Sequence, residues 1–276
     1  MAAAIPPQWN LYQNSVVSFP EEKNSIQYVG RPSIHSEAGK GRMSYPGDFD
    51  EHSIRIFESV KPFTMTSPER VLALHEAVKY LVSNGICGSL VECGVWRGGS
   101  AMVILQTLMQ LGDTSREIFL YDTFTGMTMP GAVDMSIHGE PALEQFSRTR
   151  TSDDSSDWCF SSLEEVKQNV LRTGYSEEKI HFIQGKVEKT IPGILPGAIA
   201  LLRLDTDWYD STRHEMAHLF PLLQPGGVLI IDDYGFWKGA RKAVDEYICE
   251  NHLCLFLNRI DDTGRLAVKL PGNRMR

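Results

Sequence analysis

Short apolar runs alternate with longer amphipathic stretches along the chain from about residue 66 onward. Each run is bounded by turn residues and is short, which predicts a buried strand of a parallel sheet. The stretches between them carry apolar residues at helical spacing, and most begin near a capping Ser or Thr and stop at Gly. The expected strands are SLVEC, EIFLYD, KIHFIQG, AIALLRLD and GGVLIID, at residues 89–93, 117–122, 179–185, 198–205 and 226–232. The expected helices cover residues 66–85, 98–112, 161–174, 210–223 and 239–251.

Two further apolar runs close the chain, HLCLFLNRI at residues 252–260 and RLAVKL at 265–270, joined by the turn DDTG. A connection this short makes neighbouring strands antiparallel, whereas strand–helix–strand repeats give right-handed parallel crossovers. We therefore predict an α/β fold with a doubly wound, Rossmann-like mixed sheet of about seven strands that ends in an antiparallel hairpin.

Two segments lack such periodicity. Residues 1–45 are rich in Pro, Ser, Asn and Gly but also carry aromatic residues, which predicts a partly ordered N-terminal extension. Residues from about 123 to 160 follow the second strand and show no clear element of their own. Because long loops at the ligand edge of such sheets are commonly functional, we expect a lid-like insertion there, within a domain that spans residues 46–276.

Carboxylates follow two consecutive strands of the predicted sheet. Asp205 and Asp207 end the run LLRLDTD, and Asp232 and Asp233 end the run PGGVLIIDD. Parallel strands bring their carboxyl ends to one edge, where open α/β folds bind ligands. Several acids held together there repel one another strongly, so the pattern indicates a divalent-metal site.

Other polar residues near these acids have simpler interpretations. Asp210, which stands before Ser and Thr, is expected to cap the following helix. His214 and His218 lie one turn apart on that helix and are expected to mark a helix face rather than a metal site.

A glycine-rich turn follows the first strand in VECGVWRGGS. Glu92 ends the strand, and Gly94, Gly98 and Gly99 lead into a helix whose N-terminus favours negative charge. Asp122 ends the second strand, where a carboxylate commonly accepts hydrogen bonds from ribose hydroxyls. Together these residues indicate a nucleoside-binding site. The glycine spacing differs from the dinucleotide fingerprint GxGxxG, which argues against a nicotinamide-dependent oxidoreductase.

The composition favours small-molecule ligands. A formal net charge of −8 and the lack of a Lys/Arg run argue against a nucleic-acid groove. No apolar run reaches the ~18 residues of a membrane span, and the first residues lack a basic, apolar leader, so we expect no membrane partner and a cytoplasmic protein. The five cysteines show no metal or redox spacing and are expected to be free thiols.

Six motifs, in this order and spacing, give the chain a resemblance to a known family. They are TMTSPER, VECGVWRGGS, YDTFTGM, LLRLDTDWYDST, PGGVLIIDDYG and ARKAVDEY, between about Tyr45 and Tyr247. The sequence resembles the macrocin O-methyltransferase family, class I S-adenosylmethionine enzymes that methylate sugar hydroxyls in antibiotic biosynthesis. This resemblance implies an enzyme of the EC 2.1.1 type.

The resemblance also implies where S-adenosylmethionine binds. Its methionine part would contact Glu92 and the turn from Gly94 to Ser100, in which Trp96 lies, and its ribose would contact Asp122.

Similarity to the wider metal-dependent group that includes catechol O-methyltransferase extends this site. Met65 and Thr66 would touch the methionine part, and Ser100 its carboxylate. Gly185 after the third strand is a further expected cofactor residue, but the GKVEKT that begins there replaces the family's aromatic and acidic pair, so the contacts near the adenine stay open.

Methyl transfer to a hydroxyl requires close alignment of the reactants and removal of the hydroxyl proton. We expect Asp205, Asp232 and Asp233 to bind Mg²⁺ and Asp207 to act as the general base, roles that the resemblance also implies. A carboxylate is too weak a base for a free alcohol, so Asp207 fits this role only beside a cation that acidifies the hydroxyl.

The acceptor is open at this stage. A glycosylated small molecule or a nucleotide-activated sugar is the leading hypothesis, and a phenolic or catechol-like acceptor is the alternative. An NAD(P)-dependent oxidoreductase and a non-catalytic binding protein are the remaining hypotheses. The resemblance suggests a homo-oligomer. Residues that could either line an acceptor pocket or simply pack are Trp208, Tyr234, Trp237, Lys238 and Arg241.

Overall fold

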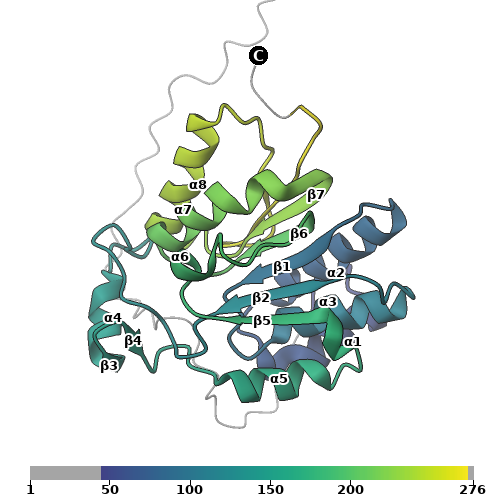
Figure 1. Ribbon diagram of the computed structural model, residues 1–276, viewed down its shortest axis with the longest axis horizontal. Helices are drawn as coiled ribbons and strands as arrows, with labels where there is room; N and C mark the ends of the chain where they lie inside the picture. Colours follow the sequence, from purple (N-terminus) through teal and green to yellow (C-terminus); the bar gives the residue numbers. More distant parts are fainter. Residues whose placement is uncertain (1–44, 273–276) are drawn as a thin grey trace, which may run out of the picture. The chain divides into compact units, whose positions relative to one another are not determined.

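The computed structural model describes residues 45–272, which form an α/β fold around one mixed sheet (Figure 1). The sheet has seven strands in the order β5-β2-β1-β6-β7-β9-β8. The first five in this order are parallel, and β9 is antiparallel to both β7 and β8. The predicted architecture, including the terminal hairpin, is confirmed. The strands are β1 (Ser89–Cys93), β2 (Ile118–Asp122), β5 (Ile180–Gln184), β6 (Ile199–Leu204), β7 (Leu223–Ile231), β8 (Asn258–Arg259) and β9 (Arg265–Val268).

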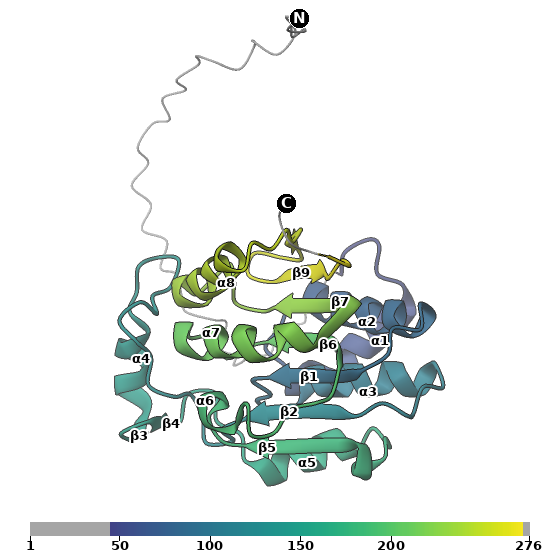
Figure 2. The ribbon, with the colours of Figure 1, turned by 45° about the horizontal axis from the view of Figure 1, so that its top comes forward.

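Helices cover both faces of this sheet (Figure 2). One hydrophobic core lies between the sheet and α1, α2, α3 and α5, and a second lies between the sheet and α6, α7 and α8. Each parallel strand is therefore buried on both sides, which explains why the strands read as continuous apolar runs. The helices are α1 (Glu51–Val60), α2 (Pro68–Ser83), α3 (Gly99–Gln110), α5 (Leu163–Leu171), α6 (Val187–Thr190), α7 (Tyr209–His218) and α8 (Lys238–Glu250), with short 3₁₀ turns at Lys61–Phe63, Glu177–Lys179 and Phe220–Leu222.

Local capping fixes where the two clearest helices begin. The Ser67 side chain accepts a hydrogen bond from the Arg70 amide, and Pro68 occupies the first position of α2. Ser162 caps α5 in the same way. These caps agree with the predicted helix starts.

The insertion, residues 123–160, is more ordered than its sequence indicates. It contains α4 (Ala142–Thr149) and a small antiparallel pair, β3 (Arg150–Ser152) with β4 (Ser155–Ser156), so the expectation that it has no element of its own is wrong. Only Ala142 and Phe146 of α4 are buried, one turn apart, and an apolar face this narrow leaves little periodicity to recognise.

The last predicted strands are longer than the observed ones. Residues 252–260 alternate as a strand should, yet only Asn258–Arg259 pair with β9. Leu253, Leu255 and Leu257 pack into the second core without joining a ladder. Alternating burial therefore does not require strand pairing here.

The parallel register aligns the strand ends that carry the predicted site. Cys93 in β1 pairs with Tyr121 in β2 and Leu204 in β6, and Leu204 pairs with Ile231 in β7. The turns that follow these strands therefore meet at one edge of the sheet. The predicted N-terminal extension lies outside the described residues. Among residues 45–272, no helix is long and apolar enough to cross a membrane.

Candidate active site

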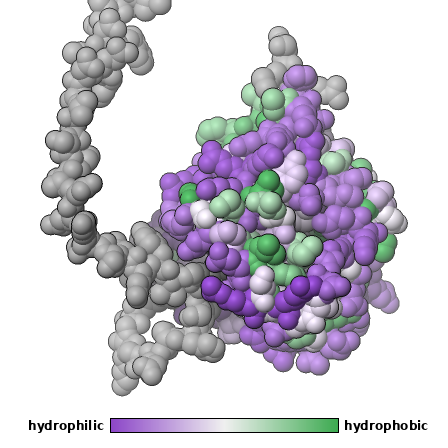
Figure 3. Space-filling view, turned by 90° about the vertical axis from the view of Figure 1, so that its left-hand side faces the viewer, coloured by the Kyte–Doolittle hydropathy of each residue, from purple (hydrophilic) through white to green (hydrophobic). Residues whose placement is uncertain are grey.

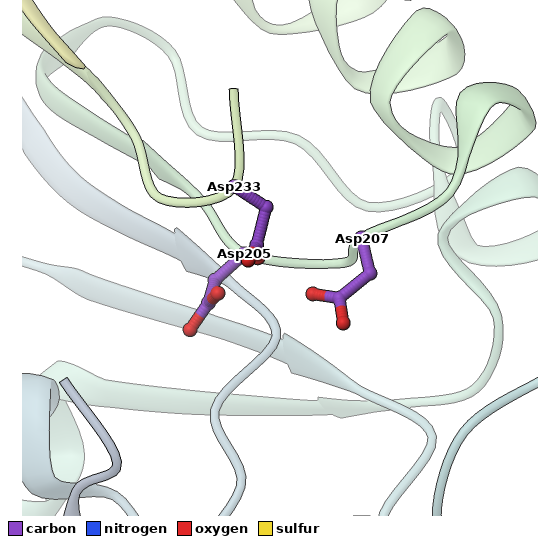
Figure 4. Close-up of side chains that lie close together, drawn as sticks. All are labelled: Asp205, Asp207 and Asp233. Carbon is purple, nitrogen blue, oxygen red and sulfur yellow. The ribbon is translucent and has the colours of Figure 1, made fainter. Parts of the chain in front are cut away.

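Three carboxylates converge at this edge (Figure 4). Asp205 and Asp207 follow β6, Asp233 follows β7, and each offers an oxygen atom within 4.8 Å of the others. We call Asp205, Asp207 and Asp233 the acid cluster. Oxygen ligands of this kind suit Mg²⁺, so the residues present fit the predicted cation.

Asp207 is held in an unusual local conformation. Its φ of 71° lies in the left-handed region, which Asp tolerates better than most residues. The side chain is buried, and its Oδ2 accepts a hydrogen bond from the Trp237 indole Nε1 at 3.0 Å. The backbone therefore turns this carboxylate toward Asp205 and Asp233 (Figure 4).

Asp232 is directed toward two arginines. Its Oδ1 lies 2.6 Å from Nη2 of Arg203, and its Oδ2 accepts a hydrogen bond from Arg70. Arg70 also contacts Asp261 at 2.9 Å, in the turn of the terminal hairpin. Asp232 therefore lies beside the acid cluster, but each of its two carboxylate oxygens binds a guanidinium group.

Arg203 is the buried centre of this ion-pair network. It lies on β6 with 3% of its side chain exposed, and it binds Glu92 at 2.7 Å, Asp205 at 3.0 Å and Asp232. Although burial opposes its charge, Asp232, Asp205 and Glu92 raise the pKa of Arg203, so its guanidinium stays protonated.

Negative charge exceeds positive charge around the acid cluster. Burial and the neighbouring Asp232 raise the pKa of Asp205 well above its usual value. Burial raises the pKa of Glu92 to about 8, although Arg203 opposes the shift. These shifts show that the site resists holding every carboxylate ionised at once, and a bound cation would relieve that repulsion.

The glycine turn, residues 94–100, brings the end of β1 against the end of β6. A Cβ on Gly94 would lie 2.1 Å from the Asp205 carbonyl oxygen, and the Gly94 φ is +82°. Gly98, also with positive φ, is the N-cap of α3, and Ser100 is buried in the first turn of that helix. Only glycine permits this close approach, which sets the predicted cofactor turn directly beside the acid cluster.

Asp122 organises the neighbouring turns. Its Oδ2 accepts hydrogen bonds from the amides of Val95 at 2.6 Å and Trp96 at 3.0 Å, and its Oδ1 accepts from Phe124 at 2.7 Å. The carboxylate thus ties the glycine turn to the end of β2. Contact with a ribose stays a prediction, added to this structural role.

The remaining predicted cofactor residues flank this turn. The Gly185 amide donates to the Asp122 carbonyl at 2.9 Å, so the end of β5 lies beside β2. Thr66 hydrogen-bonds Thr64. A Cβ added to Gly99 would lie 2.7 Å from the Cβ of Thr64, so the segment before α2 packs against the start of α3. Met65 is 38% exposed in that segment.

The insertion is attached to both loops that carry the acids. Asp134 is buried, and its Oδ1 accepts from the Tyr209 amide at 2.8 Å while its Oδ2 accepts from Gly131 at 2.7 Å. Asp134 therefore caps α7 from 75 residues away. Asp210 is exposed in the first turn of α7, so the prediction that it is the cap is wrong.

The surface of the insertion is mixed. The face that carries it shows apolar side chains among polar ones (Figure 3). The exposed large apolar side chains of the insertion are Met129, Val133, Ile137, Leu143 and Phe160.

The histidines of α7 have other partners. His214 Nε2 lies 2.9 Å from the Ile191 carbonyl, and the rings of His214 and His218 are 4.2 Å apart. Neither belongs to the acid cluster, and their role as a helix face stays a prediction. Arg241 pairs with Asp245 on its own helix.

Sequence reasoning missed several residues that hold the site. Arg203 had a recognisable signal, since it is the one charge inside the apolar run AIALLRL. Arg70 and Asp134 had none, because their partners lie far away in the sequence.

The fold, the glycine turn and the adjacent acids together define a class I O-methyltransferase, a group that takes its methyl group from S-adenosylmethionine. Residues 57–268, more than half of the chain, match the family described as macrocin O-methyltransferase (TylF). The chain therefore belongs to the macrocin O-methyltransferase family.

Curated relatives support this assignment. The chain is 34% identical over 201 residues to the 8-demethyl-8-(2,3-dimethoxy-alpha-L-rhamnosyl)-tetracenomycin-C 4'-O-methyltransferase of Streptomyces olivaceus, covering 73% of each chain. It is 29% identical over 202 residues to the demethyldecarbamoylnovobiocin O-methyltransferase of Streptomyces niveus, again covering 73% of each.

Solved structures agree. The O-methyltransferase NovP has a TM-score of 0.67 and 28% identity, with 76% of this chain and 83% of that chain covered. The calicheamicin methyltransferase CalS11 shares the fold, with a TM-score of 0.52, 15% identity and coverage of 84% and 99%. The oxidoreductase and binding-protein hypotheses are therefore set aside.

Proposed function

We propose that this enzyme transfers the methyl group of S-adenosylmethionine to a sugar hydroxyl of a natural product, with Mg²⁺ as cofactor. The observation that carries the proposal is the acid cluster beside the glycine turn, since Gly94 contacts the backbone of Asp205. Methyl donor and acceptor hydroxyl would therefore meet at one edge of the sheet. The relatives named above include an enzyme whose name states a rhamnosyl-bearing substrate.

The proposed cation ligands are Asp205, Asp232 and Asp233. Asp205 and Asp233 belong to the acid cluster, which supports their role. Asp232 is engaged by Arg203 and Arg70, so we expect it to contribute less to Mg²⁺ affinity than Asp233. When bound, Mg²⁺ would acidify the acceptor hydroxyl and fix it in place.

The protein's own residues have distinct tasks in this reaction. Asp207 takes up the hydroxyl proton at its carboxylate as the methyl group is transferred. Glu92, Ser100 and the glycine turn hold the methionine part of the donor, with Asp122 at the ribose. Arg203 fixes Glu92 and Asp205 relative to each other, so donor and acceptor sites keep one geometry.

Metal dependence is tested by binding and by activity. We expect calorimetry on EDTA-treated protein to detect Mg²⁺ binding, strongly weakened in Asp233→Asn, less in Asp232→Asn and unchanged in Asp210→Asn. Methyl transfer should stop in EDTA and return with Mg²⁺. Full activity in EDTA together with no Mg²⁺ binding would reject the metal proposal.

The acceptor class is tested by a panel with mass-spectrometric detection of methylated products. The panel contains rhamnosylated polyketides, nucleotide-activated deoxysugars, and free phenols and catechols. Methylation of glycosides alone supports the proposal, and methylation of phenols alone overturns it in favour of the alternative acceptor. A cytoplasmic location and a homo-oligomer stay predictions from the sequence.

A further inference from the structure

We propose that Trp237 is a positioning residue that fixes the carboxylate of Asp207 through its indole N–H. This inference rests on the proposed role of Asp207 as the base. Trp237 does not react with the substrate in this proposal; it acts through Asp207. The effect would be to hold the carboxylate in one orientation before the acceptor arrives.

The contact has the features of a strong, specific hydrogen bond. Trp237 Nε1 lies 3.0 Å from Asp207 Oδ2, and only 6% of Trp237 and 3% of Asp207 are exposed. An indole N–H can only donate a hydrogen bond, so its partner must be an acceptor such as the carboxylate oxygen of Asp207. Burial strengthens a bond to a charged acceptor, because water competes poorly there.

The Trp237 indole is itself held by neighbouring rings. Its centroid lies 4.9 Å from that of Phe236, 5.1 Å from that of Trp208 and 6.0 Å from that of Trp158, all in edge-to-face arrangements. Such packing restricts rotation of the ring and adds stabilisation beyond simple burial. The donor therefore has a defined direction toward Asp207.

The insertion fixes the backbone of Trp237 as well. Ser136 forms an antiparallel bridge with Trp237, the Ile137 amide donates to the Phe236 carbonyl at 2.8 Å, and the Lys238 amide donates to the Met135 carbonyl at 2.9 Å. Residues 135–137 thus bind both neighbours of Trp237. Because Trp237 contacts the proposed base, its side chain links the insertion to the proposed chemistry.

Indole NMR tests the contact without an acceptor. The chain has five tryptophans, so ¹⁵N-labelled protein gives five indole N–H signals at most, and Trp237→Phe and Trp208→Phe assign two of them. We expect Asp207→Asn to shift the Trp237 signal clearly and the Trp208 signal much less, because Trp208 donates instead to the Thr128 carbonyl at 3.1 Å. An unchanged Trp237 signal in folded Asp207→Asn would overturn the proposal.

Kinetics test the consequence, with the glycoside that the acceptor panel shows to be methylated. Trp237→Phe should lower kcat about tenfold to a hundredfold, with the KM for S-adenosylmethionine within about threefold of wild type. Trp208→Phe, which removes an indole N–H from the same aromatic group, should lower kcat much less. Equal kcat losses in the two variants, or a loss explained by a lower melting temperature, would contradict a positioning role.

A double variant separates this inference from the proposed function. Trp237→Phe added to Asp207→Asn should cause no further loss of kcat, since the indole acts through that carboxylate. If Asp207→Asn keeps full activity, the base assignment fails. If Asp207→Asn is inactive while Trp237→Phe is fully active, the base assignment stands and the Trp237 inference fails.

Discussion

The two sides of the sheet edge are built in different ways. The proposed cofactor side, formed by β1, β2 and the start of α3, is shaped by backbone, with Gly94 packed against the Asp205 carbonyl and Asp122 accepting hydrogen bonds from the amides of the glycine turn. The proposed acceptor side is shaped by side chains from distant segments, in which Asp134 and Trp237 are central. Substitutions are therefore expected to act through backbone strain on the cofactor side and through lost side-chain contacts on the acceptor side.

The largest effect is expected on the acceptor side. Asp207→Asn should lower kcat about 10²- to 10⁴-fold, because an amide cannot take up the hydroxyl proton. Affinity for S-adenosylhomocysteine should stay within about twofold, since Asp207 belongs to the acceptor side. Steady-state kinetics and calorimetry measure the two quantities.

Asp210→Asn is the matched control for this substitution. Asp210 lies three residues further along the chain, is exposed, and has no place in the acid cluster. Its kcat should equal that of wild type. Equal activity of Asp207→Asn and Asp210→Asn would remove Asp207 from the role of base.

The backbone character of the cofactor side is tested by Gly94→Ala. The new Cβ would meet the Asp205 carbonyl oxygen at 2.1 Å, in a left-handed conformation with φ +82°. We expect the free energy of unfolding to fall by about 3 kcal/mol, from the clash and the strained φ together, with loss of S-adenosylhomocysteine binding.

Gly112→Ala is the matched control. Gly112 has a similar φ of +73°, but a Cβ there would meet nothing within 4 Å, so the substitution should lower the free energy of unfolding by only about 1 kcal/mol. Equal losses in chemical denaturation would show that the close approach is unimportant.

The insertion's attachment is tested by Asp134→Ala. The substitution leaves the amides of Tyr209 and Gly131 without their acceptor, which should lower the free energy of unfolding by about 2 kcal/mol. It should also lower kcat, because α7 and the loop of Asp207 lose their anchor. Asp153→Ala lies in the same insertion with its side chain fully exposed and should change neither quantity. A kcat unaffected by Asp134→Ala would show that this anchor of the insertion has no influence on the chemistry.

This difference between the two sides also explains how much of the site the sequence could predict. Glu92, Asp122 and Asp205 each end an apolar run, so their placement at one edge followed from strand periodicity. The family resemblance added the cofactor, and the family match confirms the enzyme class.

Pairs between distant segments left no such trace. Arg70 binds Asp232 across 162 residues, and Asp134 caps α7 across 75. Neither contact repeats with a helical or strand period, and each joins segments that only the folded chain brings together. The sequence could therefore predict that four aspartates lie at this edge, but not that Asp207 binds Trp237 or that Asp232 binds two arginines.

The smallest predicted effect concerns stability against pH on the cofactor side. Burial raises the pKa of Glu92 from 4.5 to about 8 in the folded, metal-free enzyme. Between these values the folded state keeps a proton that the unfolded state has lost, so the contribution of Glu92 to stability is complete below about pH 4.5 and declines as pH rises toward about 8. In EDTA, Glu92→Gln should therefore flatten the decline measured by chemical denaturation at several pH values. Some slope should persist, because the pKa of Asp205 is raised as well.

The exposed control Glu178→Gln should keep the wild-type slope of stability against pH. Parallel curves for Glu92→Gln and wild type would mean that Arg203 keeps Glu92 ionised throughout, and that the cofactor side is held by a permanent buried ion pair.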